Sequence, residues 1–137
     1  MKRSFIIYPV GVIRKSEKEV KIEIYPEYRD ALLRLENFSH IIVLFWFDRN
    51  DDPEKRKVLQ VHPKKKKENP LSGVFATCSP LRPNLIGLTV CRILELKGNI
   101  IKIDDIDAFD ETPVIDIKPY IPKVHLIRDA KVPEWMR

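Results

Sequence analysis

The stretch IGLTVCRILELKGNIIKIDDI, residues 86–106, decides the fold. Residues 86–96 and 100–106 both have the apolar, β-favouring composition of strands. Gly98-Asn99 between them is a strong signal for a tight hairpin turn. The sequence therefore predicts an antiparallel hairpin here, and an antiparallel sheet around it.

The rest of the chain supplies further short strands. Apolar residues alternate with polar ones, or run on without a break, in several segments bounded by turn residues. Only residues 27–35 have the spacing of a helix, because Ala31, Leu32 and Leu35 share one face. We therefore expect an all-β fold, either a barrel or a sandwich, with at most one short helix. The predicted strands are residues 5–14, 20–24, 38–47, 58–62, 73–77 and 114–117, beside the two of the hairpin.

Length and composition limit the possible classes of protein. The chain has 137 residues, 44% hydrophobic and 33% charged, so we expect a single globular domain over residues 1–137 with an irregular tail at 123–137. The longest apolar run, residues 41–47, is far shorter than the roughly 20 residues of a membrane helix. No signal peptide is visible, and a cytoplasmic protein is expected. Cys78 and Cys91 are expected to be free thiols, and the three histidines lack metal-ligand spacing, so no metal is expected.

A proline-framed loop is the first candidate for a binding site. In GVFATCSPLRPNLIGL, residues 73–88, Pro80 and Pro83 flank Leu81-Arg82 and restrict the loop. A stiff loop would present Arg82 for bidentate recognition of a carboxylate or phosphate. The alternative is a rigid turn in which Arg82 pairs with an acid on the protein's own surface.

Charged clusters give three more candidates. Five acidic residues lie between residues 104 and 111, and their mutual repulsion would raise their pKa values unless cations or hydrogen bonds intervene. Asp110 is the sharpest candidate, because Phe109 beside it could act as an apolar anchor; the alternative is a solvated hairpin end. Asp48-Arg49 follows a buried strand, at the mouth of a barrel. The run Lys64, Lys65, Lys66 and Lys67 could contact nucleic-acid phosphates, although such runs are often only solvated.

Four ordered motifs resemble the TsaA-like family, which includes S-adenosyl-L-methionine-dependent tRNA methyltransferases. They are PVGVIR (9–14), LENFSH (35–40) with the strand after it, residues 73–88, and DETPVIDIKPYIP (110–122). The resemblance implies a β-barrel, a homodimer, and methylation of the exocyclic amine of a threonylcarbamoyl-modified adenosine in the tRNA anticodon loop. It places the contacts to S-adenosyl-L-methionine at Asp48, Arg49, Cys78, Leu88, Asp107, Ala108, Phe109 and Asp110. Arg82 is added to this set from its own loop.

Some positions depart from the family pattern. The family typically has His-Gln where this chain has Asp48-Arg49, and Arg where it has Cys78. These departures motivate an alternative hypothesis, a non-catalytic β-barrel that binds nucleic acid or a nucleotide-like ligand. A third hypothesis is that the protein binds the cofactor but methylates a small molecule. For a methyltransferase, Asp48 and Asp110 are the candidates to accept the proton of the amine.

The C-terminal segment offers contact material for a homodimer. An interface between two copies would supply the cleft that a small packed barrel lacks. Covering an edge of the chain's own barrel is the other use of this segment. The apolar residues concerned are Tyr120, Ile121, Val124, Leu126, Ile127 and Trp135.

Overall fold

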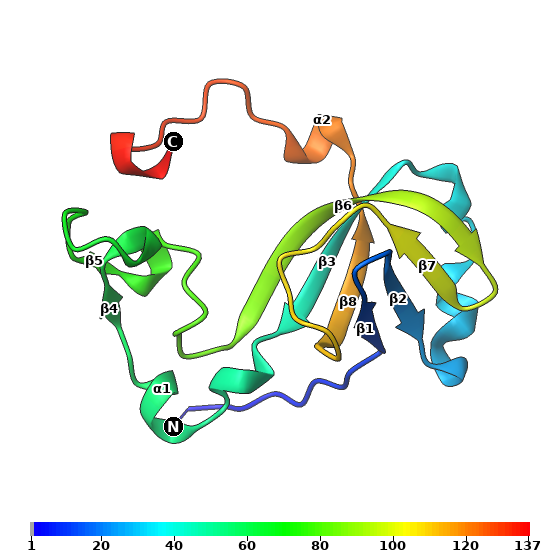
Figure 1. Cartoon of the computed structure of the whole chain (residues 1–137), viewed down its shortest axis with the longest axis horizontal. Helices are drawn as coiled ribbons and strands as arrows, with labels where there is room; N and C mark the ends of the chain where they lie inside the picture. The colour runs from blue at the N-terminus through cyan, green and yellow to red at the C-terminus, as the bar shows by residue number, and fades with distance from the viewer. Residues whose placement is uncertain (1) are drawn as a thin grey trace. The chain divides into compact units, whose positions relative to one another are not determined.

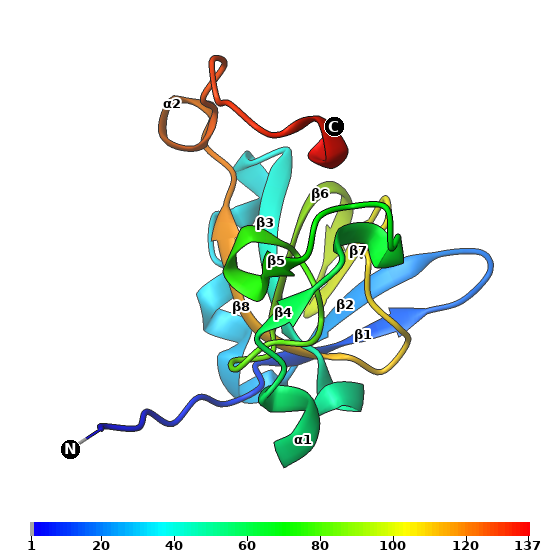
Figure 2. The same cartoon turned by 90° about the vertical axis from the view of Figure 1, so that its left-hand side faces the viewer.

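Six antiparallel strands close into a barrel in the computed structural model, which describes residues 2–137 (Figures 1 and 2). The order around the barrel is β1-β2-β7-β6-β3-β8, and β8 pairs with β1 to close it. The prediction of an all-β barrel is confirmed. The barrel strands are β1 (Gly11–Lys15), β2 (Val20–Ile24), β3 (His40–Trp46), β6 (Ile86–Lys97), β7 (Ile100–Ile103) and β8 (Pro113–Pro119).

Alternating β-branched side chains build the barrel interior. In β2, Val20, Ile22 and Ile24 are buried, while the two residues between them are half-buried. Ile22 lies opposite Ile13 of β1 and Ile101 of β7, and all three are fully buried. Removal of this much apolar surface from water is the main source of the barrel's stability.

The predicted hairpin is confirmed. Gly98 has a φ of 63°, a left-handed conformation that glycine adopts without steric cost, and β6 pairs with β7 on either side of this turn. Asn99 then fixes the turn to the neighbouring strand, because its side-chain amide donates to the carbonyl oxygen of Ile24 at 2.8 Å.

The chain divides into two compact units. The barrel unit consists of the residues up to Trp46 together with Leu88–Tyr120, and the loop unit consists of Phe47–Gly87 and Ile121–Arg137. The loop unit has only the two-stranded sheet of β4 and β5, and otherwise short helical turns. Its elements are η3 (Asp48–Asn50), α1 (Pro53–Arg56), β4 (Gln60–Val61), η4 (Pro63–Lys65), β5 (Ser72–Gly73), η5 (Val74–Ala76), α2 (Pro122–His125) and η6 (Glu134–Met136).

Several predicted boundaries were wrong. Residues 5–10 form no strand, and β1 begins only at Gly11, so Phe5, Ile6 and Tyr8 stay exposed. Residues 73–77 form the turn η5 after a two-residue strand, because the Thr77 hydroxyl and backbone N–H both bond to the Val74 carbonyl. The strand expected at residues 58–62 is reduced to Gln60–Val61.

The predicted helix exists as a 3₁₀ segment. It is η1 (Pro26–Leu32), and η2 (Leu35–Asn37) follows it. Arg34 between them has a φ of 75°, which an α-helix cannot contain, so the two stay separate. Asn37 ends the second segment, and Leu32 is the buried residue of the first.

Candidate functional site

The acidic loop between β7 and β8, residues 104–111, is organised by one lysine. Lys15, at the end of β1, donates from Nζ to the carbonyl oxygens of Ile106 (2.7 Å) and Ala108 (3.2 Å). The same ammonium lies 3.4 Å from Oδ1 of Asp105, and the backbone N–H of Lys15 donates to Oδ1 of Asp110 at 2.8 Å. Lys15 therefore holds the middle of this loop, from Asp105 to Asp110, against the end of β1.

Hydrogen bonds relieve the repulsion expected among these carboxylates. The Ile106 backbone N–H, and then the Lys15 ammonium, hold the pKa of Asp105 below its usual range. Asp104 accepts from the backbone N–H groups of Arg92 and Asp105. These two aspartates are thus occupied in shaping the loop.

Asp107 and Asp110 are the carboxylates of this loop that remain available to a ligand. Both are exposed, and the side chain of Asp107 accepts no hydrogen bond from any residue in the range 2–137. Asp110 has one oxygen bound by Lys15 and the other directed to no described donor. Phe109 is 59% exposed, so the expectation that it anchors Asp110 by being buried was wrong.

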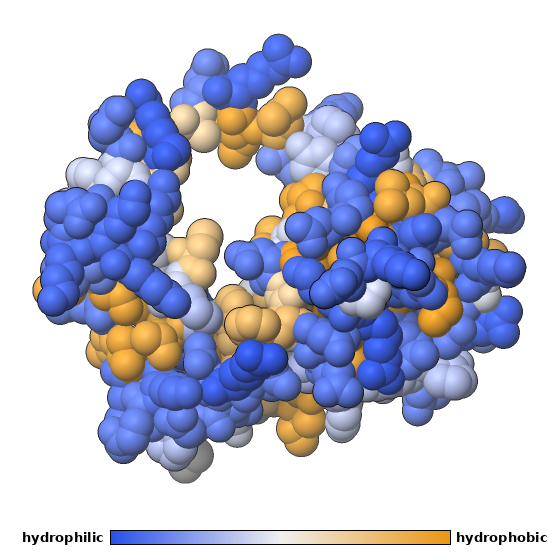
Figure 3. Space-filling view, viewed as in Figure 1, coloured by the Kyte–Doolittle hydropathy of each residue, from blue (hydrophilic) through white to orange (hydrophobic). Residues whose placement is uncertain are grey.

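Leu88 lies on an exposed apolar face of β6. Outward residues alternate with inward ones along this strand, and Cys91 on the inner side is fully buried. Leu88 (61% exposed), Val90 and Leu94 remain accessible to solvent. Apolar patches interrupt the hydrophilic surface of the barrel unit (Figure 3). A large apolar side chain in such a position is typical of a contact surface.

In the loop unit, the Asp48-Arg49 segment is hydrogen-bonded to the proline-framed loop. The Phe47 N–H donates to the Leu85 carbonyl (2.8 Å), and the Asn50 side-chain amide donates to the Pro80 carbonyl (3.0 Å). Asp48 and Arg49 lie between these two attachments, both exposed. The structure therefore brings together two of the sequence motifs that were singled out.

Arg56 forms a second connection to the same loop. Its Nε donates to the Pro83 carbonyl at 2.8 Å, one Nη reaches the Asn84 side chain, and the other pairs with Asp51. Lys55 also donates to the Arg49 carbonyl, at 3.1 Å. Residues of α1 thus hold both segments in place.

Arg82 closes its own loop. Its Nη1 donates to the carbonyl oxygens of Thr77 (3.1 Å) and Ser79 (3.0 Å), while the Ser79 hydroxyl accepts from the Leu81 N–H. Three hydrogen bonds thus connect parts of this loop to one another, and Arg82 itself donates two of them. Any ligand contact of Arg82 must use the N–H groups that remain.

The two cysteines are free and differ in accessibility. Cys78 is exposed beside Arg82's loop, whereas Cys91 is buried. Burial, aided by the negative charges of Asp104 and Asp105, raises the pKa of Cys91 to about 12. Its thiol is therefore protonated at neutral pH and makes no nucleophile.

Neither a metal-binding cluster nor a membrane-spanning helix occurs among residues 2–137. Residues 2–137 contain no group of three or more His, Cys, Asp or Glu side chains placed to bind a metal ion. Among those residues, no helix combines the length and the apolar character that crossing a bilayer requires.

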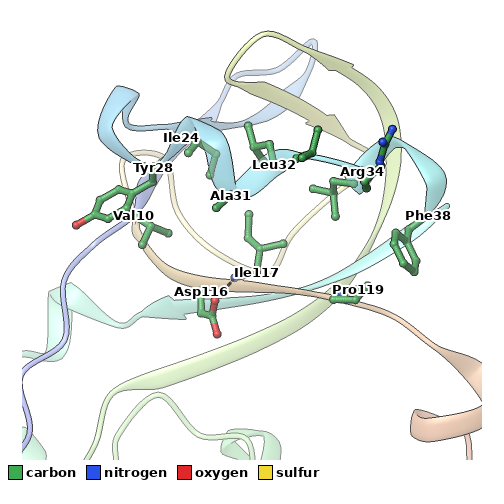
Figure 4. A pocket seen from close by; sticks show the side chains of 12 residues that line it. Val10, Ile24, Tyr28, Ala31, Leu32, Arg34, Phe38, Asp116, Ile117 and Pro119 are labelled. Carbon is green, nitrogen blue, oxygen red and sulfur yellow. Dashed lines mark hydrogen bonds between the residues drawn. The ribbon is translucent and has the colours of Figure 1, made fainter.

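A separate apolar cavity of about 280 Å³ lies beside η1 (Figure 4). Figure 4 shows Leu32 and Ile117 on its walls, and Tyr28, Arg34 and Asp116 also line it. None of the site residues predicted from the sequence lines it. It is a feature of the barrel unit alone.

No sequence motif pointed to Lys15, Asn50 or Arg56 as site residues. Lys15 lies more than 90 positions from the loop it holds, and Asn50 and Arg56 lie about 30 positions from theirs. Nothing local marks them, since an isolated lysine, asparagine or arginine in a polar segment resembles any solvated residue. Only the pairing of distant segments gives them their roles.

These features define a small antiparallel β-barrel protein with polar loops ordered by side-chain hydrogen bonds. The chain belongs to the tRNA-methyltransferase O N-terminal domain family, whose sequence pattern matches residues 8–126. The TsaA-like resemblance is thereby confirmed.

Curated relatives agree with this assignment. A probable S-adenosyl-L-methionine-binding protein of Methanocaldococcus jannaschii is 46% identical over 120 residues, 88% of this chain and 95% of that protein. One of Pyrococcus horikoshii is 52% identical over 115 residues, 84% of this chain and 82% of that protein. The tRNA (adenine(37)-N6)-methyltransferase of Mus musculus is 36% identical over 103 residues, 75% of this chain but 23% of the mouse protein.

A solved structure agrees as well. The crystal structure of TrmO from Pseudomonas aeruginosa superposes with a TM-score of 0.76 at 28% identity. The match covers 98% of this chain and 63% of that protein, so this chain spans less than two thirds of the solved relative.

Proposed function

We propose that this protein is an S-adenosyl-L-methionine-dependent methyltransferase acting on the exocyclic amine of an adenosine in the tRNA anticodon loop, threonylcarbamoyl-modified as in the family. The proposal places the protein in the cytoplasm and treats residues 1–137 as one functional domain, with 123–137 as its irregular tail. Its main support is the structure of the two loops that hold the family's cofactor positions. Both loops are fixed by residues distant in the sequence, and the carboxylates of Asp48 and Asp107 are exposed and have no partner in the described chain.

The residues present suit the cofactor chemically. Ribose hydroxyls and an α-ammonium group need acceptors, and the Asp48 and Asp107 side chains accept nothing from the described chain. Leu88 offers an exposed apolar surface to a flat base, and the remaining N–H groups of Arg82 suit a carboxylate. Arg49, Cys78, Ala108 and Phe109 complete the proposed binding set. When bound, the cofactor supplies an electrophilic methyl group on a sulfonium.

The chain's own contribution to transfer is alignment and proton acceptance. An adenine amine is a weak nucleophile because its lone pair is delocalised, so most of the rate must come from positioning. Asp48 and Asp110 are the proposed proton acceptors, since both carboxylates are exposed and neither is neutralised by a salt bridge. Asp110 is the better positioned, because the Lys15 N–H fixes one of its oxygens.

The anticodon loop is a suitable substrate because its bases are single-stranded. A protein can splay such a base out and read it without opening a duplex. The net charge of +5 and the four exposed lysines 64–67 would attract the phosphates around it.

A homodimer is part of the proposal. The outer face of β6 exposes Leu88, Val90 and Leu94, and the C-terminal segment exposes Val124 and Ile127. Burial of such side chains in a twofold interface would remove a substantial apolar surface from water. Light scattering at low protein concentration tests this, and a monomer that still binds the cofactor tightly would contradict it.

Calorimetric titration with S-adenosyl-L-methionine tests the binding site. We expect Asp107→Asn to weaken binding about tenfold, because the variant loses a charged hydrogen-bond acceptor. Asp129→Asn is the matched control, since Asp129 is an exposed aspartate of the tail, and its affinity should equal the wild type's. If the wild-type protein does not bind the cofactor, the chain is instead a non-catalytic nucleic-acid-binding barrel, which its departures at Asp48, Arg49 and Cys78 favour.

A further inference from the structure

Two consecutive lysines have an unusual backbone conformation. Lys64 and Lys65 have φ angles of 58° and 56°, in the left-handed region that favours glycine. Side chains with a Cβ are disfavoured there, so two in succession persist only where the surroundings impose them. Of residues 2–137, only Arg34 and Glu111 among the other non-glycine positions share this feature.

Two side-chain hydrogen bonds form a clasp across the segment that contains these lysines. The His62 ring donates from Nδ1 to the Asn69 carbonyl at 2.8 Å, and the Asn69 side-chain amide donates to the Pro63 carbonyl at 2.7 Å. These bonds join the two ends of the lysine segment. Inside it, the Lys65 N–H bonds to the His62 carbonyl and the Asn69 N–H to the Lys66 carbonyl. We call residues 62–69 the clasped loop.

The clasped loop presents concentrated positive charge. All four lysines from 64 to 67 are exposed, and Glu68 is the loop's one acidic residue. The Lys64 ammonium donates to the carbonyl oxygen of Arg137 at 3.1 Å, and the other three lysines have no side-chain partner among residues 2–137. Buried Pro63 fixes its base. Figure 3 shows the surface near β5, the strand that follows the loop, as strongly hydrophilic. Holding four like charges together costs energy, and a polyanion would remove that cost.

We propose that the clasp of His62 and Asn69 preorganises the lysine loop as an RNA-phosphate binding surface. This deepens the proposed function and rests on it. His62 and Asn69 are positioning residues: they touch no RNA in this account, but they hold the lysines in a conformation that free chains rarely adopt. The RNA then binds without having to order the loop, which lowers the entropic cost of association.

Opening the clasp while keeping every lysine tests the inference. Asn69→Ala and His62→Ala each remove one bond and leave all four ammonium groups. We expect each to weaken tRNA binding about fivefold at fixed salt, and the double variant to be little worse than either, because each opens the same loop. Asn37→Ala is the matched control: Asn37 is an exposed asparagine in a 3₁₀ turn with no side-chain partner in the described chain.

Two single variants test the strain separately. Lys65→Gly relieves the left-handed backbone, whereas Lys66→Gly removes the same charge from a residue without positive φ. We expect Lys65→Gly to have the higher melting temperature, since glycine suits its conformation. The reverse order would overturn the claim that the clasp holds the lysines under strain.

The outcomes for binding are distinct. Unchanged tRNA affinity in both clasp variants would overturn the inference and leave the proposed function intact. Absence of tRNA binding by the wild-type protein would overturn both. We expect tRNA affinity to fall only in the clasp variants, while their affinity for the cofactor equals that of the wild type.

Discussion

The barrel unit and the loop unit are stabilised in different ways. In the barrel unit, strand ladders and a continuous set of buried β-branched residues hold the chain, and Ile13, Ile22 and Ile101 lie opposite one another. In the loop unit, strands are two residues long, and side chains such as Arg56 and Asn69 tie the backbone together.

The two units should therefore respond differently to single substitutions. Apolar burial tolerates changes in surface loops, so the barrel unit can carry variable segments. Individual hydrogen bonds contribute less, so the loop unit depends on many specific residues. Variants in each unit should therefore differ in the size of their effects.

The largest expected effect is in the barrel core. Ile101→Ala removes a fully buried side chain at the centre of β7 and should lower the free energy of unfolding by about 4 kcal/mol. Leu94→Ala, on an exposed position of β6, is the control and should cost far less. Urea denaturation measures the free energy of unfolding of both variants. Equal losses in the two would show that the inner and outer faces of the barrel do not differ in their contribution to stability.

The next effect concerns a close approach in the same unit. A Cβ on Gly11 would collide with the carbonyl oxygen of Glu23 on the paired strand β2, and that backbone cannot move independently. Gly11→Ala should therefore destabilise the barrel by about 3 kcal/mol. Gly73→Ala is the control, because its nearest neighbour leaves ordinary contact space. A wild-type stability for Gly11→Ala would show that β1 and β2 are less closely packed than described.

A smaller effect is expected in the loop unit. Arg56→Ala removes the bonds to Pro83, Asn84 and Asp51, at a cost of about 1.5 kcal/mol. Lys57→Ala, whose ammonium pairs only with Glu54 at the surface, should change stability little. Limited proteolysis of residues 47–87 reports the difference. Equal protection in the two variants would contradict the role given to Arg56.

The smallest effect depends on pH. The pKa of Asp105 is lowered in the folded state, so its bonds to Ile106 and Lys15 stabilise the protein above the unfolded pKa of about 3.9 and are lost as the pH falls through the folded value. Melting curves should be recorded from neutral to acidic pH. Below about pH 4, the melting temperature of Asp105→Asn should fall less steeply with pH than that of the wild type. If the two melting temperatures fall equally with pH, Asp105 does not stabilise the loop.

Local sequence signals predicted the strands and the hairpin, whereas contacts between distant residues were not predictable from the sequence. Alternation in β2 and the Gly98-Asn99 turn are local signals, and both strands and hairpin were found from them. The apolar residues before Gly11 look like a strand, but among residues 5–10 only Val10 forms backbone hydrogen bonds, to Val114 and Tyr25, so periodicity alone misplaced that boundary. In the site, exposed polar motifs were visible, whereas Lys15 acts through tertiary contacts that no local pattern encodes.

The proposed activity is tested most directly by analysis of modified nucleosides. Unmethylated tRNA carrying the threonylcarbamoyl modification is incubated with the protein and S-adenosyl-L-methionine, digested, and examined by mass spectrometry. We expect a methyl group on the exocyclic amine of that adenosine, and a yield about a hundredfold lower for Asp110→Asn, whose side chain can no longer accept the proton. A cofactor-bound protein that leaves the nucleoside unmethylated would contradict the account.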